Sequence, residues 1–82
     1  MSGLLARWVD VAIDEYLALA PATQVAVDDA VRRLLTDPSG PASAYDPSSD
    51  QWTVTAGDGQ VMIVYVFRPG GPWLVVLRLV VI

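Results

Sequence analysis

The stretch "QWTVTAGDGQVMIVYVFRPGGPWLVVLRLVV" (51–81) decides the fold of this chain. It is rich in Val, Ile and aromatic residues, which favour strands, and two clusters of Gly and Pro, which favour turns, interrupt it. The spacing of these clusters predicts strands at 51–56, 60–67 and 73–81. Because short turns join consecutive strands in antiparallel order, we expect a β-meander.

The turn residues also predict a register. Asp58 and Gly59 suit a two-residue turn of type I′, in which both residues take positive φ. Across the first hairpin the expected partners are Trp52 with Tyr65, Val54 with Ile63 and Ala56 with Val61. If 68–72 form the second turn, the expected partners are Phe67 with Trp73, Tyr65 with Val75, Ile63 with Leu77 and Met62 with Arg78.

This register divides the side chains between two faces of the sheet, because successive residues of a strand point to opposite sides. The bulkier set is expected to face the helices: Trp52, Val54, Val61, Ile63, Tyr65, Phe67, Trp73, Val75, Leu77 and Leu79. The other face carries Thr53 and Thr55 together with an exposed, mostly apolar set. Exposed apolar patches usually mark interfaces. We therefore predict a partner-binding surface formed by Met62, Val64, Val66, Leu74, Val76, Arg78 and Val80.

The first half of the chain predicts a helical hairpin and a loop. Apolar residues recur at helical spacing at Ala12, Ile13, Tyr16, Leu17 and Ala20, and again at Val27, Ala30, Val31, Leu34 and Leu35. Asp10 is the N-cap candidate of the first helix, and Pro21 marks the break between the two. The polar, Pro-rich segment 36–50 reads as a long loop. Residues 4–8 form either a short leading strand or the beginning of the first helix.

Composition bounds the function. The chain of 82 residues is expected to form a single domain over 1–82, and its net charge of −4 opposes binding to phosphate backbones. It contains no Cys and no His, which excludes disulfides, thiolate chemistry and the commonest zinc ligand. The longest apolar run, 61–67, is far below the roughly 18 residues of a membrane span. We expect a cytoplasmic protein without a secretory signal, a membrane segment or a cofactor.

The five arginines hold the candidate polar sites. Arg78 has three interpretations: it pairs with a partner's carboxylate, it pairs within the chain, or it binds a phosphate in catalysis. Arg32 and Arg33 follow Asp28 and Asp29 by four residues, which indicates either a solvated, ion-paired helix face or a docking site for a partner.

Other residues have structural interpretations. Tyr65 is expected in the core with its hydroxyl on a backbone carbonyl, and Trp52 and Trp73 are expected in core or edge packing. The loop carboxylates Asp46, Asp50 and Asp58 lack the alternating spacing of a calcium loop, and no metal site is predicted.

Three segments together resemble the RelE/ParE toxins of bacterial type II toxin–antitoxin systems: "LAPATQVAVDDAVRRLLTDP" (19–38), "GDGQVMIVYVF" (57–67) and "WLVVLRLVV" (73–81). The resemblance implies an α+β fold of β-α-α-β-β-β order, in which a helical hairpin packs on one face of a small antiparallel sheet. It also implies a cognate antitoxin as partner. In the RelE branch the target is mRNA on the ribosome, and in the ParE branch it is DNA gyrase.

The resemblance bears on catalysis as well. RelE-type toxins carry basic residues on the open sheet face and after the last strand, but here Met62 occupies one such position and Val81 and Ile82 stand where a basic tail would begin. The sequence therefore predicts a toxin-like component that acts through protein interaction, with ribosome-dependent mRNA cleavage as the enzymatic possibility and Arg78 as its catalytic candidate. The alternative is a non-toxic module of the same fold that binds a second copy of itself or a small ligand.

Overall fold

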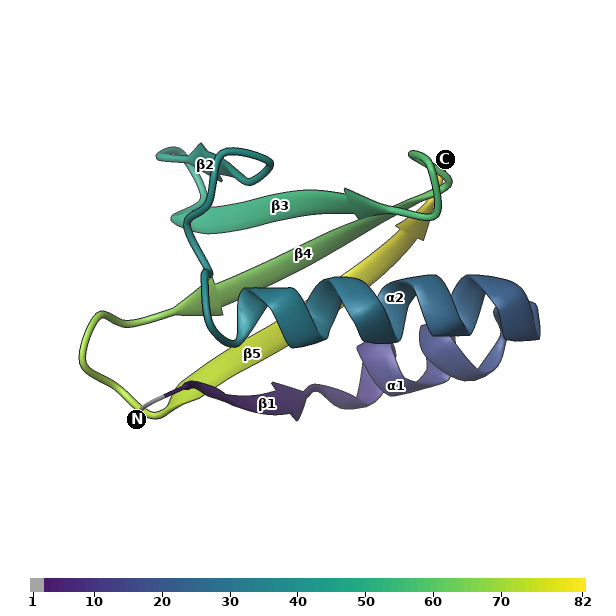
Figure 1. The fold of residues 1–82 in the computed structure, drawn as a ribbon, viewed down its shortest axis with the longest axis horizontal. Coiled ribbons are helices and arrows are strands. Elements are labelled where there is room, and N and C mark those ends of the chain that lie inside the picture. The colour runs from purple at the N-terminus through teal and green to yellow at the C-terminus, as the bar shows by residue number, and fades with distance from the viewer. Residues whose placement is uncertain (1–2) are drawn as a thin grey trace.

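The protein has an α+β fold in which two helices pack with a five-stranded mixed sheet. The structure is a computed structural model and describes residues 3–82. In chain order the elements are β1 (Leu5–Trp8), α1 (Asp10–Leu17), α2 (Pro21–Leu34), β2 (Ala44–Asp46), β3 (Gln51–Ala56), β4 (Val61–Phe67) and β5 (Trp73–Val81). The strands lie in the order β1-β5-β4-β3-β2 (Figure 1).

Two features of the sheet differ from the expected antiparallel meander. The expected leading strand does form, over Leu5–Trp8, but β1 runs parallel to β5, with Leu5 beside Trp73 and Trp8 beside Val76. The predicted loop 36–50 contains a further strand, β2, which pairs with β3. Both differences arise at the edges of the sheet, where pairing is decided by tertiary contacts.

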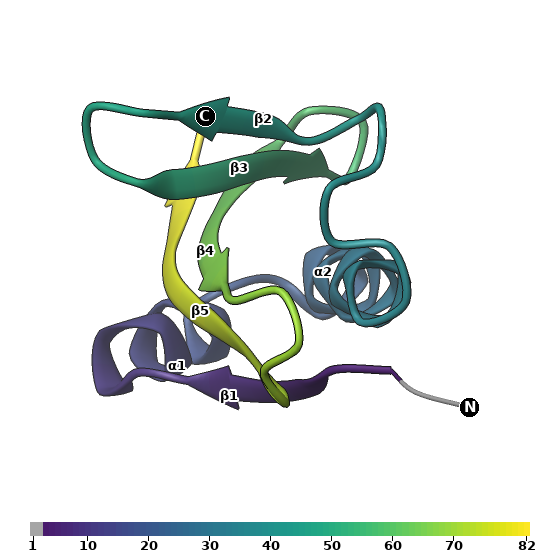
Figure 2. The same ribbon diagram turned by 90° about the vertical axis from the view of Figure 1, so that its left-hand side faces the viewer.

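The helices occupy different places relative to the sheet. Figure 2 shows a curved sheet with α2 lying in its hollow side, while α1 continues from β1 along the outer edge of β5. The expectation that both helices cover one face is therefore correct for α2 and wrong for α1. The side of the sheet away from α2 is called the open face below.

The helix pattern explains this arrangement. Pro21 stands at the first position of α2, where its fixed φ suits a helix and its missing N–H costs nothing, so it begins this helix. The predicted stripe is confirmed, because the buried residues of α2 are Val27, Ala30, Val31 and Leu34. In α1 only Ala12 is buried, and Leu17 is 67% exposed. Val9, not Asp10, is the N-cap residue of α1.

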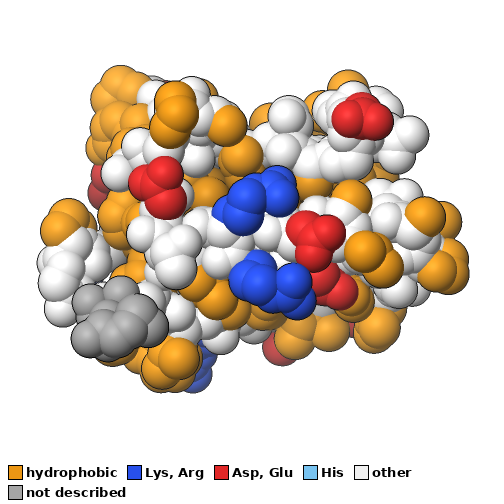
Figure 3. Space-filling view, in the orientation of Figure 1, with side chains coloured by type: hydrophobic (Ala, Val, Ile, Leu, Met, Phe, Trp, Pro, Cys, Tyr) orange, Lys and Arg blue, Asp and Glu red, His pale blue; other side chains and the backbone are white. Residues whose placement is uncertain are grey.

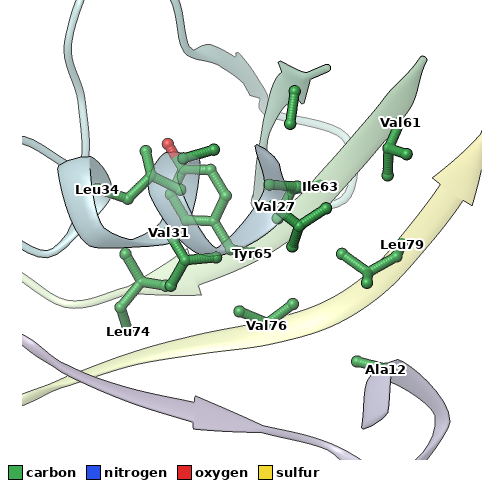
Figure 4. Close-up of a cluster of buried hydrophobic side chains, with 12 residues drawn as sticks. Ala12, Val27, Val31, Leu34, Val61, Ile63, Tyr65, Leu74, Val76 and Leu79 are labelled. Atoms are coloured by element: carbon green, nitrogen blue, oxygen red, sulfur yellow. The ribbon is translucent and has the colours of Figure 1, made fainter. Parts of the chain in front are cut away.

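The core lies between α2, α1 and the hollow face of the sheet (Figure 4). Its largest fully buried side chain is Tyr65. The Tyr65 hydroxyl donates to the carbonyl oxygen of Pro38 and lies 2.8 Å from Ser43 Oγ, as expected of a core tyrosine. Burial raises the pKa of Tyr65, because the phenolate would lose its hydration.

The predicted register of β3 and β4 is confirmed. Trp52 pairs with Tyr65, Val54 with Ile63 and Ala56 with Val61. The turn residues Asp58 and Gly59 have φ of 57° and 85°, which satisfies the requirement of a type I′ turn for positive φ at both positions.

The predicted register of β4 and β5 is wrong by one residue at the turn. Phe67 pairs with Leu74, and Tyr65 pairs with Val76. A β-bulge then leaves Leu77 without a partner, so that Arg78 pairs with Val64 and Leu79 with Ile63. Because a bulge adds one residue to a strand, it restores the expected faces after the slip. Leu79 and Arg78 therefore point as predicted, whereas Leu74 and Val76 point to the opposite face.

Candidate protein-binding surface

The open face is formed by β3, β4 and β5. Cross-strand pairs align Met62 with Val80, Val64 with Arg78 and Val66 with Val75. On the β3 side, Thr53 and Thr55 stand beside Val64 and Met62. With the bulge residue, the open face comprises Thr53, Thr55, Met62, Val64, Val66, Val75, Leu77, Arg78 and Val80.

Burial alternates along β4 and separates the two faces. Val61, Ile63 and Tyr65 have no exposed surface, whereas Met62, Val64 and Val66 between them are only half-buried. Val80 on β5 is 37% exposed. Because α2 lies on the hollow side and α1 along the β5 edge, no helix within residues 3–82 covers the open face. The apolar side chains of this face are therefore in contact with water.

Two residues predicted for this surface belong to the core instead. Leu74 and Val76 are completely buried. The one-residue slip at the β4–β5 turn directs them into the hollow side, so a partner cannot reach them while the protein is folded. Val75 and Leu77, which were expected in the core, are half-buried residues of the open face.

Arg78 forms an ion pair within the chain. Its Nη2 donates to Glu15 Oε2 at 2.8 Å, and its Nε lies 3.0 Å from the same oxygen. The backbone N–H of Leu79 donates to Glu15 Oε1 at 2.9 Å. β1 ends before this point, so Glu15 of α1 supplies the acceptor that a neighbouring strand would otherwise provide. Of the three interpretations of Arg78, the structure shows the pair within the chain.

The charges of this pair stabilise each other. The hydrogen bonds from Arg78 hold the pKa of Glu15 below its usual value, against a smaller opposing effect of burial. The same contact raises the pKa of Arg78. The guanidinium of the open face thus has a carboxylate bound to it over the whole physiological pH range.

Arg32 and Arg33 lie on α2, away from the open face. Figure 3 shows the side of the molecule that carries α2, with basic and acidic side chains next to each other. Arg32 pairs with Asp29 at 3.2 Å, three residues earlier, and not with Asp28. Asp28 instead accepts a hydrogen bond from the Tyr16 hydroxyl at 3.0 Å. The docking role of these arginines stays a prediction.

Sequence reasoning missed two functional features. Glu15 gave no signal, because its partner Arg78 lies 63 positions away. Trp73 was expected in core or edge packing but is 42% exposed, and Tyr45 is 46% exposed. Tyr45, Trp52 and Phe67 form a row with ring centroids 5.1 and 5.5 Å apart, and Arg7 lies over the ring of Trp73 at 5.4 Å.

Within residues 3–82, no three His, Cys, Asp or Glu side chains are grouped closely enough to hold a metal ion. Neither helix of this part of the chain has the length and apolar character needed to cross a membrane. Comparison of the chain with protein-family models, with curated proteins and with solved structures found no match.

Proposed function

We propose that the protein is a RelE/ParE-like toxin component that binds its target protein through the open face and is held inactive by an antitoxin chain that covers this face. The observation that carries this proposal is the set of uncovered apolar side chains in three adjacent cross-strand pairs of β4 and β5. The helical hairpin lies between the first strand and the remaining strands of the sheet, as the resemblance implies, and β2 is one strand beyond the β-α-α-β-β-β order.

The open face is suited to binding because covering it is favourable. Burial of a Val, Leu or Met side chain from full exposure contributes about 1.5–3 kcal/mol, and the half-buried residues of this face gain a part of that. The chain also stands to gain from a partner, since a small domain buries a limited fraction of its own surface.

The state of Arg78 favours binding over RNA cleavage. Cleavage needs a base for the 2′-hydroxyl and cations for the developing phosphorane charge. Glu15 neutralises Arg78 through two donor atoms, and Arg7, the partner of Val75 on the same side of the sheet, lies over the ring of Trp73. An ion pair at the border of an apolar surface instead provides fixed polar groups that orient a partner.

The test compares two valine-to-glutamate variants on opposite sides of the molecule. Val64→Glu places a charge in the centre of the open face, and the control Val25→Glu places one on α2, where Val25 is already 58% exposed. Each variant is expressed from an inducible promoter without neighbouring genes, and circular dichroism verifies that it is folded. We expect growth arrest with the unmodified chain and with Val25→Glu, and its loss with Val64→Glu.

The other outcomes decide between the alternatives. Harmless overproduction of the unmodified chain contradicts the toxin proposal. If analytical ultracentrifugation then shows oligomers that Val64→Glu dissociates, the open face is a self-association surface of a non-toxic module. New 5′ ends in ribosome-bound mRNA during growth arrest would instead identify a nuclease, and would overturn the argument from Arg78.

A further inference from the structure

The end of the sheet formed by the β4–β5 turn holds a depression of about 420 Å³. Figure 2 views the molecule from this end, with the turn that joins β4 to β5 toward the reader. The depression is lined by Asp50, Trp52, Val66, Phe67, Arg68, Gly71, Pro72, Trp73 and Val75. Its volume lies within the range of small-molecule sites, which is about 300–1,000 Å³.

Aromatic rings dominate the walls. Trp52 from β3 and Phe67 from β4 pack with centroids 5.5 Å apart and an interplanar angle of 41°. The ring of Tyr45 packs against that of Trp52 with centroids 5.1 Å apart, and Trp73 of β5 adds a third ring to the lining. Trp73 is 42% exposed, and Trp52 and Phe67 are half-buried. Rings gathered at one depression provide flat apolar surfaces for stacking, so the fitting ligand is planar and aromatic.

The two charged residues of the depression differ in their availability. Asp50 Oδ1 accepts a hydrogen bond from the Tyr45 hydroxyl at 2.5 Å. Arg68 is exposed, and the ion pairs within residues 3–82 involve Arg32 and Arg78 but not Arg68. Asp50 keeps its negative charge, because a hydrogen bond from a neutral hydroxyl does not neutralise a carboxylate, and Arg68 is the cation of the depression that forms no ion pair within residues 3–82.

The turn holds Arg68 at the rim. Gly71 N–H donates to the Arg68 carbonyl oxygen at 2.9 Å, and Gly70 has a φ of 80°, a conformation that favours glycine. The Arg68 backbone is thus fixed while its side chain is free to reach a ligand. Since the protein carries a net charge of −4, a ligand with a single negative charge fits better than a polyanion.

We infer that this depression binds a small planar aromatic carboxylate, with the ring against Trp52, Phe67 and Trp73 and the carboxylate on the Arg68 guanidinium. This inference goes beyond the proposed function, although Val66 and Val75 belong to both the depression and the open face. Arg68 and the tryptophans take no part in the Val64→Glu test of the open face.

Nuclear magnetic resonance with the ¹⁵N-labelled full chain tests the site, and three probes share the indole ring. Indole-3-propionate carries a carboxylate, indole is neutral and tryptamine is a cation. We expect saturable shifts of the indole N–H signals of Trp52 and Trp73 with indole-3-propionate, and weaker binding of both other probes. The signal of Trp8, which lies outside the depression, reports non-specific effects. Equal shifts at Trp8, equal affinity for all three probes or the absence of saturation would overturn the inference.

Two matched arginine variants then distinguish a local effect of the Arg68 charge from the effect of the overall charge of the protein. Arg68→Gln should weaken binding of indole-3-propionate by up to about fivefold, the range for an exposed ion pair, and leave indole unchanged. Arg33→Gln, an exposed arginine of α2, should leave both unchanged. Equal effects of the two variants contradict the role of Arg68.

The variant Trp73→Leu tests the aromatic part of the site. It should weaken the binding of both indole-3-propionate and indole by about tenfold because a stacking surface is lost. An unchanged affinity of this variant contradicts the aromatic part of the site.

Discussion

The two faces of the sheet both consist mainly of apolar side chains, but they differ in burial. On β4, Val61, Ile63 and Tyr65 are fully buried under α2, while Val64 and Val66, equally apolar, remain half-buried on the open face. A strand that is apolar on both sides normally lies in a sheet that is covered on both faces. In this protein the helices within residues 3–82 leave the open face uncovered.

Apolar side chains therefore have different effects on the two faces of the sheet. The hollow face stabilises the fold through packing, whereas the open face leaves apolar surface in contact with water, where we propose that a partner binds. Substitutions on the hollow face should therefore change the free energy of unfolding, and substitutions on the open face should mainly change association.

The largest expected effect comes from a pair of leucines on β5. Leu74→Ala removes a completely buried side chain and should lower the free energy of unfolding by about 2–5 kcal/mol. Leu77→Ala acts on the half-buried bulge residue of the open face and should cost about 1 kcal/mol or less. Urea denaturation of the two variants measures both values. Equal costs would mean that the open face is packed as tightly as the hollow face.

A smaller effect is expected at a buried hydroxyl. Tyr65→Phe leaves the Pro38 carbonyl without its donor and should cost about 1–3 kcal/mol. Tyr45→Phe is the control, because its hydroxyl bonds an exposed carboxylate, and it should leave the stability unchanged within error. Thermal unfolding followed by circular dichroism distinguishes them. A stable Tyr65→Phe variant would show that water replaces the tyrosine hydroxyl without loss.

The pH dependence of Tyr65 follows from the direction of its shift. Burial raises its pKa above the 10.0 of a free tyrosine, so the folded state holds the proton more tightly than the unfolded state. The contribution to stability is complete below pH 10.0 and is lost as the pH rises through the folded-state pKa. Tyr65→Phe should therefore remove part of the alkaline loss of stability that denaturation at increasing pH reveals.

Local chemistry made the first hairpin and α2 predictable. The Asp58–Gly59 turn fixes its own geometry, and with it the pairing of Trp52 with Tyr65. The stripe of α2 has the period of a helix and needs no distant information. Tyr65 was predictable in the same way, since a tyrosine on the bulky face of a central strand needs an acceptor for its hydroxyl.

The second hairpin and the edges were not predictable for the opposite reason. The turn after Phe67 is one residue longer than expected, and the bulge at Leu77 compensates for it further along the strand. An alternating pattern cannot reveal either feature when both faces are apolar, because a shifted register is equally hydrophobic. The sequence around β1 likewise contains no pattern that indicates its parallel pairing with β5.

The smallest expected effect lies at the border of the two faces, where Glu15 binds Arg78 of the open face and the backbone of Leu79, whose side chain is buried. Glu15→Ala should lower the free energy of unfolding by about 1 kcal/mol, a value kept small because water screens the pair. Glu15→Gln should cost less, since the amide oxygen still accepts from the Leu79 N–H. Asp29→Asn, which breaks the exposed pair with Arg32, is the matched control.

The acid response separates the ion pair of Glu15 from its hydrogen bond to the backbone. The folded-state pKa of Glu15 lies below the 4.5 of a free glutamate, so its contribution is complete above pH 4.5 and is lost as the pH falls through the folded-state value. The stability difference between the unmodified protein and Glu15→Gln should therefore shrink below pH 4.5 and be constant from there to neutral pH. A difference that persists in acid would mean that the charge of Glu15 is irrelevant, and that α1 is held to the edge of β5 by packing and the Leu79 hydrogen bond alone.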